Sequence, residues 1–247
     1  MKTGYTNNIL ALLLPALGLA IAGSGIPLPA AAQAPISVGK VALRDQSNLS
    51  LRKAAEAGLR QMMTTISRGQ APDAKPPQNF PIAVDRYGDL GRVSLGIGFE
   101  VNTIDPAVLT KADRTADLGA MTHSTDIWNF VILSNGQPVG LLEMDKVQGR
   151  WQAVGAGSAK LAAEIVAMAP KTGDGSFRFV RIYQATSDLI EVRGSGKRSQ
   201  YLPMQSAQRS LPIAGLSAKT AAATVGSEDL LPALQSAVRS NLQRGKR

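Results

Sequence analysis

The sequence predicts an α+β fold, in which an antiparallel sheet built from a meander and hairpins packs against two or three helices. Residues Arg92–Val101 alternate strictly between apolar and small or polar side chains, as a half-buried strand does. Asn135-Gly136 separates two apolar runs, which predicts a hairpin. The elements follow one another as helix, strands, helix, strands, without the regular alternation that marks a parallel sheet.

The first helix is predicted over Ser50–Arg68. Ser50 suits the N-cap position and Gly69 suits the position just beyond the helix. Its apolar residues recur every three or four positions and share one face, a pattern typical of a core-facing helix. They are Leu51, Ala55, Leu59, Met62 and Ile66. The proline-rich stretch Gln70–Pro81 predicts a semi-extended connection.

The strand at Arg92–Val101 is the clearest strand of the chain. Gly96 and Gly98 leave the opposite face of this strand without side chains, so a backbone, a helix or a ligand could approach it closely. Close packing within the protein is the favoured explanation for these glycines. Asp105 and Pro106 then predict the start of a short helix that ends at about Lys111.

Three strands are predicted to form a meander, with Asn135-Gly136 as the first turn and Gln148-Gly149 as the second. These strands are Trp128–Leu133, Val139–Met144 and Trp151–Val154. A helix is expected over Ala159–Met168. The next strands are Phe177–Ala185, Leu189–Arg193 and Gln200–Met204, with Thr186–Asp188 as a turn.

The stretch Ala207–Gly226 is rich in Ala and Ser and predicts a flexible crossing or partial disorder, before a last helix over Ser227–Leu242. The helix followed by a meander resembles, in outline, the cystatin-like and propeptide-like α+β modules of exported bacterial proteins. This resemblance implies a fold and no particular function.

The first residues have the layout of a secretory signal peptide. Lys2 precedes the apolar run Ile9–Ala22, and small residues follow at the spacing of a cleavage site. Cleavage after Ala32 is favoured over cleavage after Ala34, because the latter would place Pro35 at the scissile bond. The alternative is a retained membrane anchor, which the proline within the apolar run disfavours. We therefore expect a protein exported to a bacterial periplasm or beyond, with no transmembrane segment after cleavage.

The predicted organisation is a signal peptide over residues 1–32, a globular domain over 33–205, and a connection with a basic helix over 206–247. Two similar halves, near 50–155 and 158–205, are conceivable as a degenerate duplication, although they share no motif. The chain has no cysteine, which excludes disulfides, thiolate nucleophiles and cysteine metal sites.

The formal net charge is +9, and only Lys2 of the predicted leader is charged, so the mature chain carries +8. From Arg178 onward, 11 Lys and Arg face 4 Asp and Glu, so most of the excess lies in this last third. Such a segment attracts anionic polymers, acidic lipid surfaces or acidic proteins, while export argues against nucleic acid. The alternative is a solvated surface that only aids solubility. The predicted basic patch comprises Arg178, Arg181, Arg193, Lys197 and Arg198.

Catalytic groups are scarce. His123 is the single histidine, expected at the surface or as a cap in a loop, because its neighbours Ser124 and Asp126 are adjacent in sequence whereas triads join separated segments. Zinc sites and other cofactors are not expected, and residues 194–199 lack the glycine spacing of a phosphate loop. Six acidic residues near predicted strands or turns leave a carboxylate-dependent hydrolase open. They are Asp85, Asp89, Glu100, Asp126, Glu143 and Asp145.

Three functional hypotheses follow. The first is an exported, non-enzymatic binding protein whose basic C-terminal third contacts an anionic envelope component. The second is a carboxylate-dependent hydrolase acting on envelope polysaccharide or peptide. The third is an assembly or inhibitor module that meets another exported protein through Gln70–Pro81 or through the Gly96 and Gly98 face.

Overall fold

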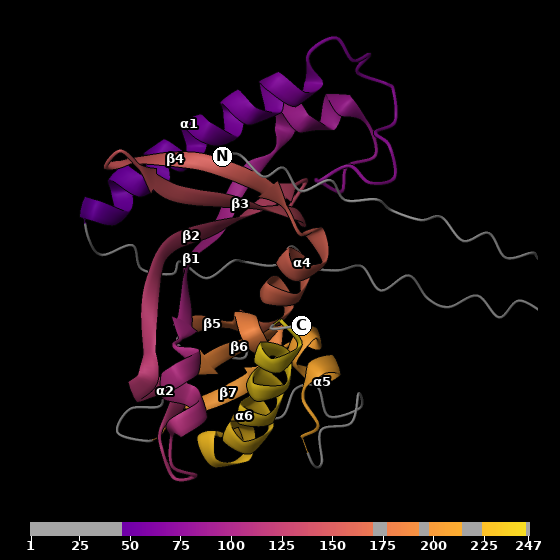
Figure 1. Cartoon of the computed structure of the whole chain (residues 1–247). Coiled ribbons are helices and arrows are strands. Elements are labelled where there is room, and N and C mark those ends of the chain that lie inside the picture. Colours follow the sequence, from indigo (N-terminus) through magenta and orange to yellow (C-terminus); the bar gives the residue numbers. More distant parts are fainter. Residues whose placement is uncertain (1–45, 170–176, 193–197, 214–223, 246–247) are drawn as a thin grey trace, which may run out of the picture. The chain divides into compact units, whose positions relative to one another are not determined.

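The computed structural model describes residues 46–169, 177–192, 198–213 and 224–245. The chain divides into two units, Met1–Ala34 and Pro35–Arg247, and the predicted signal peptide lies outside the described residues. The second unit is an α+β fold, as predicted, with an eight-stranded sheet and helices on both of its faces (Figure 1). None of the helices in the described ranges is long and apolar enough to span a membrane.

The strands of the sheet lie in the order β4-β3-β2-β1-β5-β6-β7-β8. Neighbouring strands are antiparallel except β1 and β5, which run parallel over a short stretch. The strands are β1 Ser94–Ile104, β2 Thr122–Ser134, β3 Gln137–Val147, β4 Arg150–Gly157, β5 Arg178–Ile182, β6 Ser187–Val192, β7 Gln200–Pro203 and β8 Val225–Gly226. We call α1 with β1–β4 the meander region, and β5–β8 with α5 and α6 the C-terminal region.

Within the described residues, three helices have ten residues or more and correspond to the three long helices that the sequence predicts. The first begins at Gln46, so Ser50 lies inside it, and the prediction that Ser50 is its N-cap is wrong. The helices are α1 Gln46–Ser67, η1 Tyr87–Arg92, α2 Pro106–Lys111, α3 Leu118–Met121, α4 Ala159–Met168, η3 Tyr183–Ala185, α5 Gln205–Ser210 and α6 Ser227–Arg244. The expected start of α2 is confirmed, because the Asp105 side chain accepts hydrogen bonds from the backbone N–H groups of Ala107 (2.6 Å) and Val108 (3.2 Å).

Two local predictions in the C-terminal region are wrong. The end of the predicted strand Phe177–Ala185 is the short helix η3, and the turn after it is at Thr186, which has a left-handed backbone with φ of 53°. Helix α5 occupies part of the stretch predicted as a crossing, because Ala207 is fully buried there against the sheet. Packing rather than local propensity decides both segments. Residues 214–223 of that stretch lie outside the described residues.

Helix α1 covers one face of the meander region. Its apolar stripe includes Leu51, Ala55 and Leu59, which pack with Phe130 and Leu142 of strands β2 and β3. The predicted helix face is therefore a core face, and Met63 rather than Met62 is its fully buried methionine.

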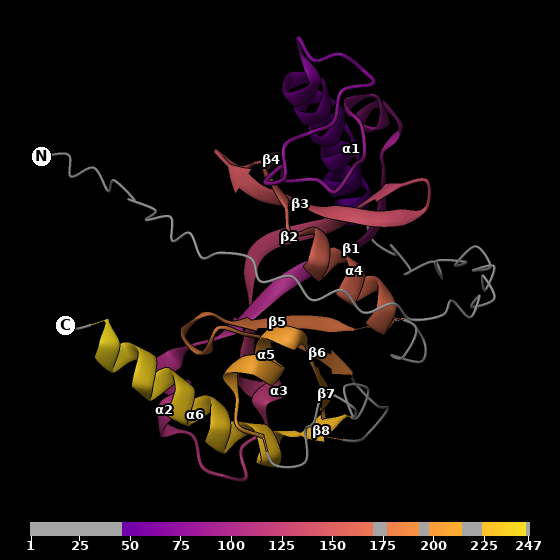
Figure 2. The same cartoon turned by 90° about the vertical axis from the view of Figure 1, so that its right-hand side faces the viewer.

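Helix α4 lies on the opposite face of the sheet, between the meander strands and strands β5–β7 (Figure 2). Ala162 and Ile165 of α4 contact a cluster that includes Val131 of β2, Phe179 of β5 and Ile190 of β6. One helix thus contributes to the packing of both regions.

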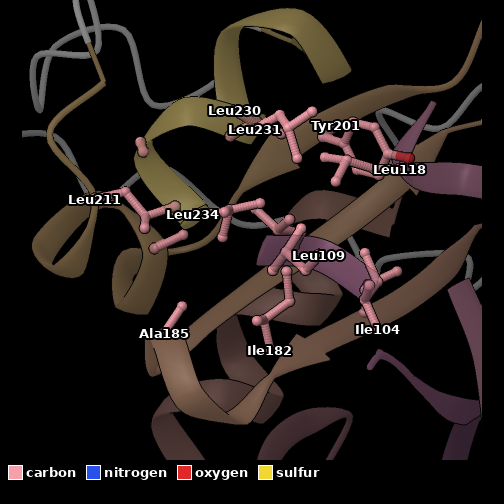
Figure 3. Close-up of a cluster of buried hydrophobic side chains, with 14 of the residues drawn as sticks. Ile104, Leu109, Leu118, Ile182, Ala185, Tyr201, Leu211, Leu230, Leu231 and Leu234 are labelled. Atoms are coloured by element: carbon pink, nitrogen blue, oxygen red, sulfur yellow. The ribbon is translucent and has the colours of Figure 1, made fainter. Parts of the chain in front are cut away.

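Helix α6 covers the remaining face of β5–β7, together with α2 and α3 (Figure 3). Its leucines Leu230, Leu231 and Leu234 are fully buried and share a cluster with Tyr201 of β7 and Leu118 of α3. The last helix is consequently part of the core rather than an appendage.

Strand β1 contributes side chains to all three clusters, which the strict alternation of its sequence did not predict. Leu95 packs on the α1 side, whereas Phe99 and Val101 pack on the α4 side and Ile104 on the α6 side. The pairing of β1 with β2 shifts register between Leu95 and Gly98, and such a bulge turns the following side chains to the other face.

Candidate functional site

The predicted basic patch is divided between the two faces of the sheet. Arg178 and Arg181 are three residues apart in β5, so their side chains leave the strand on opposite faces. Arg198 is exposed just before β7. Arg193 and Lys197 lie outside the described residues. The structure therefore does not bring Arg178 and Arg181 together on one surface.

Arg178 belongs to a buried polar network on the α6 side. Its Nε forms an ion pair with Glu191, whose side chain is 0% exposed, and its Nη2 donates to the carbonyl oxygen of Gly119 at 3.0 Å. The Ser199 hydroxyl donates to the other oxygen of Glu191 at 2.7 Å. The charge of Arg178 is thus neutralised inside the protein, where it holds β5, β6 and α3 together.

Next to this network, the Tyr201 hydroxyl is fully buried and makes no hydrogen bond within the described residues. Burial, together with the nearby negative charge of Glu191, raises the pKa of Tyr201 well above its ordinary value. The hydroxyl points toward Leu118 (Figure 3), and the side chains of Glu191, Asp117, Ser199 and Ser227 lie near it. The Tyr201 side chain is accordingly neutral, and it packs in the hydrophobic core.

Arg181 is ion-paired on the α4 side. Its Nε and Nη2 donate to the two carboxylate oxygens of Asp188 at 2.7 and 3.3 Å, and Ser206 also donates to Asp188 at 3.1 Å. Burial alone would lower the pKa of Arg181, but the bonds to Asp188 outweigh it and the pKa is raised. Its guanidinium carbon lies 5.4 Å from the centre of the Phe179 ring.

Neither Asp188 nor Glu191 is among the acidic candidates that the sequence suggested. Arg178 pairs in register with Glu191, and Arg181 with Asp188. A signal for this existed, because the two arginines and the two acidic residues have the same spacing of three. This matching spacing was missed because the sequence predicts a turn at Thr186–Asp188, which assigns Asp188 to that turn and not to a strand.

Exposed positive charge gathers instead where α2 ends against α6. Arg239 of α6 donates from Nη2 to the carbonyl oxygen of Thr110 at 2.6 Å, next to Lys111. Gln235, one turn earlier, donates to the carbonyl oxygens of Leu109 and Ala112. We define the basic end as four exposed residues, which are Lys111, Arg114, Arg239 and Arg244.

His123 is exposed, as expected, but it lies within strand β2 rather than in a loop. The hydroxyl of its neighbour Ser124 donates to Glu100 at 2.6 Å and accepts from the backbone N–H of Asp126 at 2.9 Å. Ser124 is therefore engaged by a carboxylate and not by the imidazole, so these residues do not form a Ser–His–Asp triad.

The six acidic candidates are distributed over η1, the residues just before it, and strands β1, β2 and β3. Asp89 forms an ion pair with Arg92 at 2.6 Å, whose hydrogen bond lowers the pKa of Asp89, and Glu100 is bonded to Ser124. Glu143 is the one of the six that lines a hollow described below. Among the described residues, no three His, Cys, Asp or Glu side chains are grouped so that they could hold a metal ion.

The surfaces proposed for a protein partner are partly used by the fold itself. A Cβ atom at Gly98 would overlap the ring of Phe130, so this glycine makes room for core packing. The proline-rich connection is tied to η1 by backbone hydrogen bonds from Tyr87 to Ala74 and from Gly88 to Pro72. An open groove of about 470 Å³ does lie between α1 and the edge strand β4, with Trp151 in its wall.

Comparison of the chain with protein-family models, with curated proteins and with solved structures finds no match. The resemblance to cystatin-like modules therefore remains a prediction.

Proposed function

We propose that this chain is an exported, non-enzymatic binding protein that contacts an anionic envelope component through its basic C-terminal third. The observation that carries the proposal is the basic end, whose four residues are all exposed. Arg239 of α6 bonds to Thr110 beside Lys111, Arg114 follows the end of α2, and Arg244 is the last residue of α6. The two views show α2 beside α6 (Figures 1 and 2).

The charges of the basic end are available to a partner. The described residues form four ion pairs, and none of them involves these four side chains. The acidic residues of α6, Glu228 and Asp229, lie in its first turn. Ten residues of helix separate Asp229 from Arg239, or about 15 Å, which exceeds the screening length of about 8 Å at physiological salt. Asp113 is the acidic residue within the same stretch as Lys111 and Arg114.

The experiment measures binding of the chain starting at Gln33 to vesicles containing phosphatidylglycerol, across a salt series. We expect binding that weakens steadily as salt rises, because the attraction is electrostatic. The triple variant Lys111→Gln, Arg114→Gln, Arg244→Gln should lose up to about 100-fold in affinity, at about 1 kcal/mol for each basic residue near an acidic surface. Arg239 is kept because it also caps α2.

The matched control is Lys53→Gln, Arg60→Gln, Arg150→Gln, which removes the same charge from exposed positions of the meander region. It should bind nearly as well as the unmodified chain. Equal losses in both triple variants would show that net charge alone matters and would overturn the assignment to the basic end. Absence of binding at low salt, both to these vesicles and to soluble poly-glutamate, would reject the anionic partner altogether.

A further inference from the structure

A small polar hollow lies where α4 begins, away from the basic end. Its volume is about 180 Å³. Pockets for drug-sized ligands have about 300–1,000 Å³, so this one suits a smaller molecule. Its walls combine polar and charged side chains with glycines and leucines.

The floor of the hollow is a row of residues that face each other across three strands. Asn129 of β2 pairs with Glu143 of β3, which pairs with Gly155 of β4. A Cβ atom at Gly155 would meet only the Cβ of Glu143, at 4.0 Å, so the absence of a side chain there keeps the floor open.

Asn129 is the residue that points to a ligand. It is 6% exposed, it lines the hollow, and its side-chain amide makes no hydrogen bond to any described residue. An amide offers two donors and an acceptor. Those of Asn129 are not among the fully buried polar atoms of the described residues that lack a partner, so they are reached from the hollow, where a polar guest would hydrogen-bond to them.

The first turn of α4 adds a positive pole at the same place. Ser158 precedes the helix with a left-handed backbone, φ 59°, and its side chain does not cap the helix. The backbone N–H of Ala162 bonds to Ser158 O at 3.0 Å. The N–H groups before it have no partner within the helix, and such a terminus attracts a carboxylate.

The charged side chains of the hollow have opposite signs. Arg181 lines it with its Nε and Nη2 committed to Asp188, and the negative charge of Glu143 lies close enough to raise the pKa of Arg181 further. Arg181, Glu143 and Asp188 together carry a net charge of −1. This net charge disfavours binding of an anion that has no positive group. A cation that has no carboxylate would leave the partial positive charge at the N-terminus of α4 without a partner.

We propose that this hollow binds a small zwitterionic α-amino acid. Its carboxylate would face the first turn of α4 and Arg181, its ammonium would face Glu143, and the amide of Asn129 would hydrogen-bond to it. Leu141 and Leu161 leave room for a short side chain only. This site is independent of the basic end, so the two proposals stand or fall separately.

The test is an NMR titration of the chain starting at Gln33 with glycine, alanine and serine. We expect saturable shifts of the Asn129 side-chain amide and of the backbone amides of the first α4 turn. Acetate and methylammonium, which each carry one of the two charges, and glucose, which carries none, should bind at least tenfold more weakly.

Two variants and a matched control locate the binding. Gly155→Val fills the floor and should abolish binding, while Glu143→Gln should weaken it at least tenfold. Asp145→Asn removes a carboxylate from the same face of β3 but outside the hollow, and should change nothing. No saturable binding by any of the three amino acids would overturn the proposal. Acetate or glucose binding as tightly as alanine, or equal losses in Glu143→Gln and Asp145→Asn, would do so too.

Discussion

The meander region and the C-terminal region bury different chemistry. Among the described residues, the buried polar side chains of the meander region are all uncharged, namely Asn102, Asn129 and Ser134. The two buried carboxylates, Asp188 and Glu191, both belong to β6 in the C-terminal region, one on each face of that strand. Each is matched by an arginine of β5 directly across the strand pair.

This difference shows that a basic stretch of sequence is not the same thing as a basic surface. Arg178 and Arg181 cancel Glu191 and Asp188 one for one, so the excess positive charge of the last third is unchanged by their burial. It resides on the other basic residues of that third, and in the described part of α6 these are Arg239 and Arg244. The meander region should therefore respond mainly to changes in volume, and the C-terminal region to changes in charge.

The largest effect is expected from Glu191→Ala, which leaves Arg178 buried without its carboxylate. Removing one partner of a buried pair costs about 3–5 kcal/mol of unfolding free energy. Urea denaturation measures this loss. The double variant Arg178→Met, Glu191→Leu should recover most of it, because neither charge is then stranded. A loss of unfolding free energy below about 1 kcal/mol in the single variant would be typical of an exposed ion pair. It would contradict the statement that the C-terminal region depends on buried charge.

A smaller effect is expected from Gly98→Ala in the meander region. The added methyl group would overlap the ring of Phe130, which is 1% exposed, and overpacking of this kind costs about 1–3 kcal/mol. Gly91→Ala is the control, since a Cβ there meets nothing within 4 Å. If urea denaturation gives the same stability for both variants, the meander core is not packed as tightly as described.

The smallest effect concerns Glu164 of α4, which accepts a hydrogen bond from the backbone N–H of Gln205 at 2.6 Å. Burial and the charge of Asp188 raise the pKa of Glu164, so the folded state holds this proton more tightly than the unfolded state. Its contribution to stability is therefore full below the ordinary pKa of glutamate and is lost as the pH rises through the folded value.

Glu164→Gln keeps the accepting oxygen and removes the titration. Relative to the unmodified chain, its stability should rise between about pH 4 and pH 7, by less than about 1 kcal/mol because the group is only partly buried. Thermal unfolding across this pH range measures the difference. A relative stability that falls toward neutral pH would show that the carboxylate is stabilised by folding instead.

Much of the fold could be predicted from the sequence because its signals are local. The helix over Ala159–Met168 has the predicted bounds, and the Asn135-Gly136 hairpin forms with both residues at positive φ, as its turn requires. The charged pairs of β5 and β6 were missed although the matching spacing of their residues was a signal, because the pairing depends on strand register. A turn misplaced toward Asp188 removed the alignment that would have shown them.

The hollow beside α4 depends even more on distant contacts. Asn129, Gly155 and Arg181 meet there only because β1 joins β5 in parallel, which places the end of β5 next to the meander strands. Nothing in the sequence around Asn129 indicates an amide without partners. The sequence did single out two residues of the hollow, Glu143 as an acidic candidate and Arg181 as a member of the basic patch.

The division of β1 among three clusters has a consequence for how the chain folds. The meander strands are joined by short turns and can pair through local contacts, whereas Val101 of β1 must find Phe179 of β5 far along the chain. Leu95, Phe99 and Ile104 belong to the same strand. A substitution that loosens the packing of one cluster should therefore destabilise the other two as well. The meander region should consequently form early, and the described unit should unfold as one cooperative body rather than region by region.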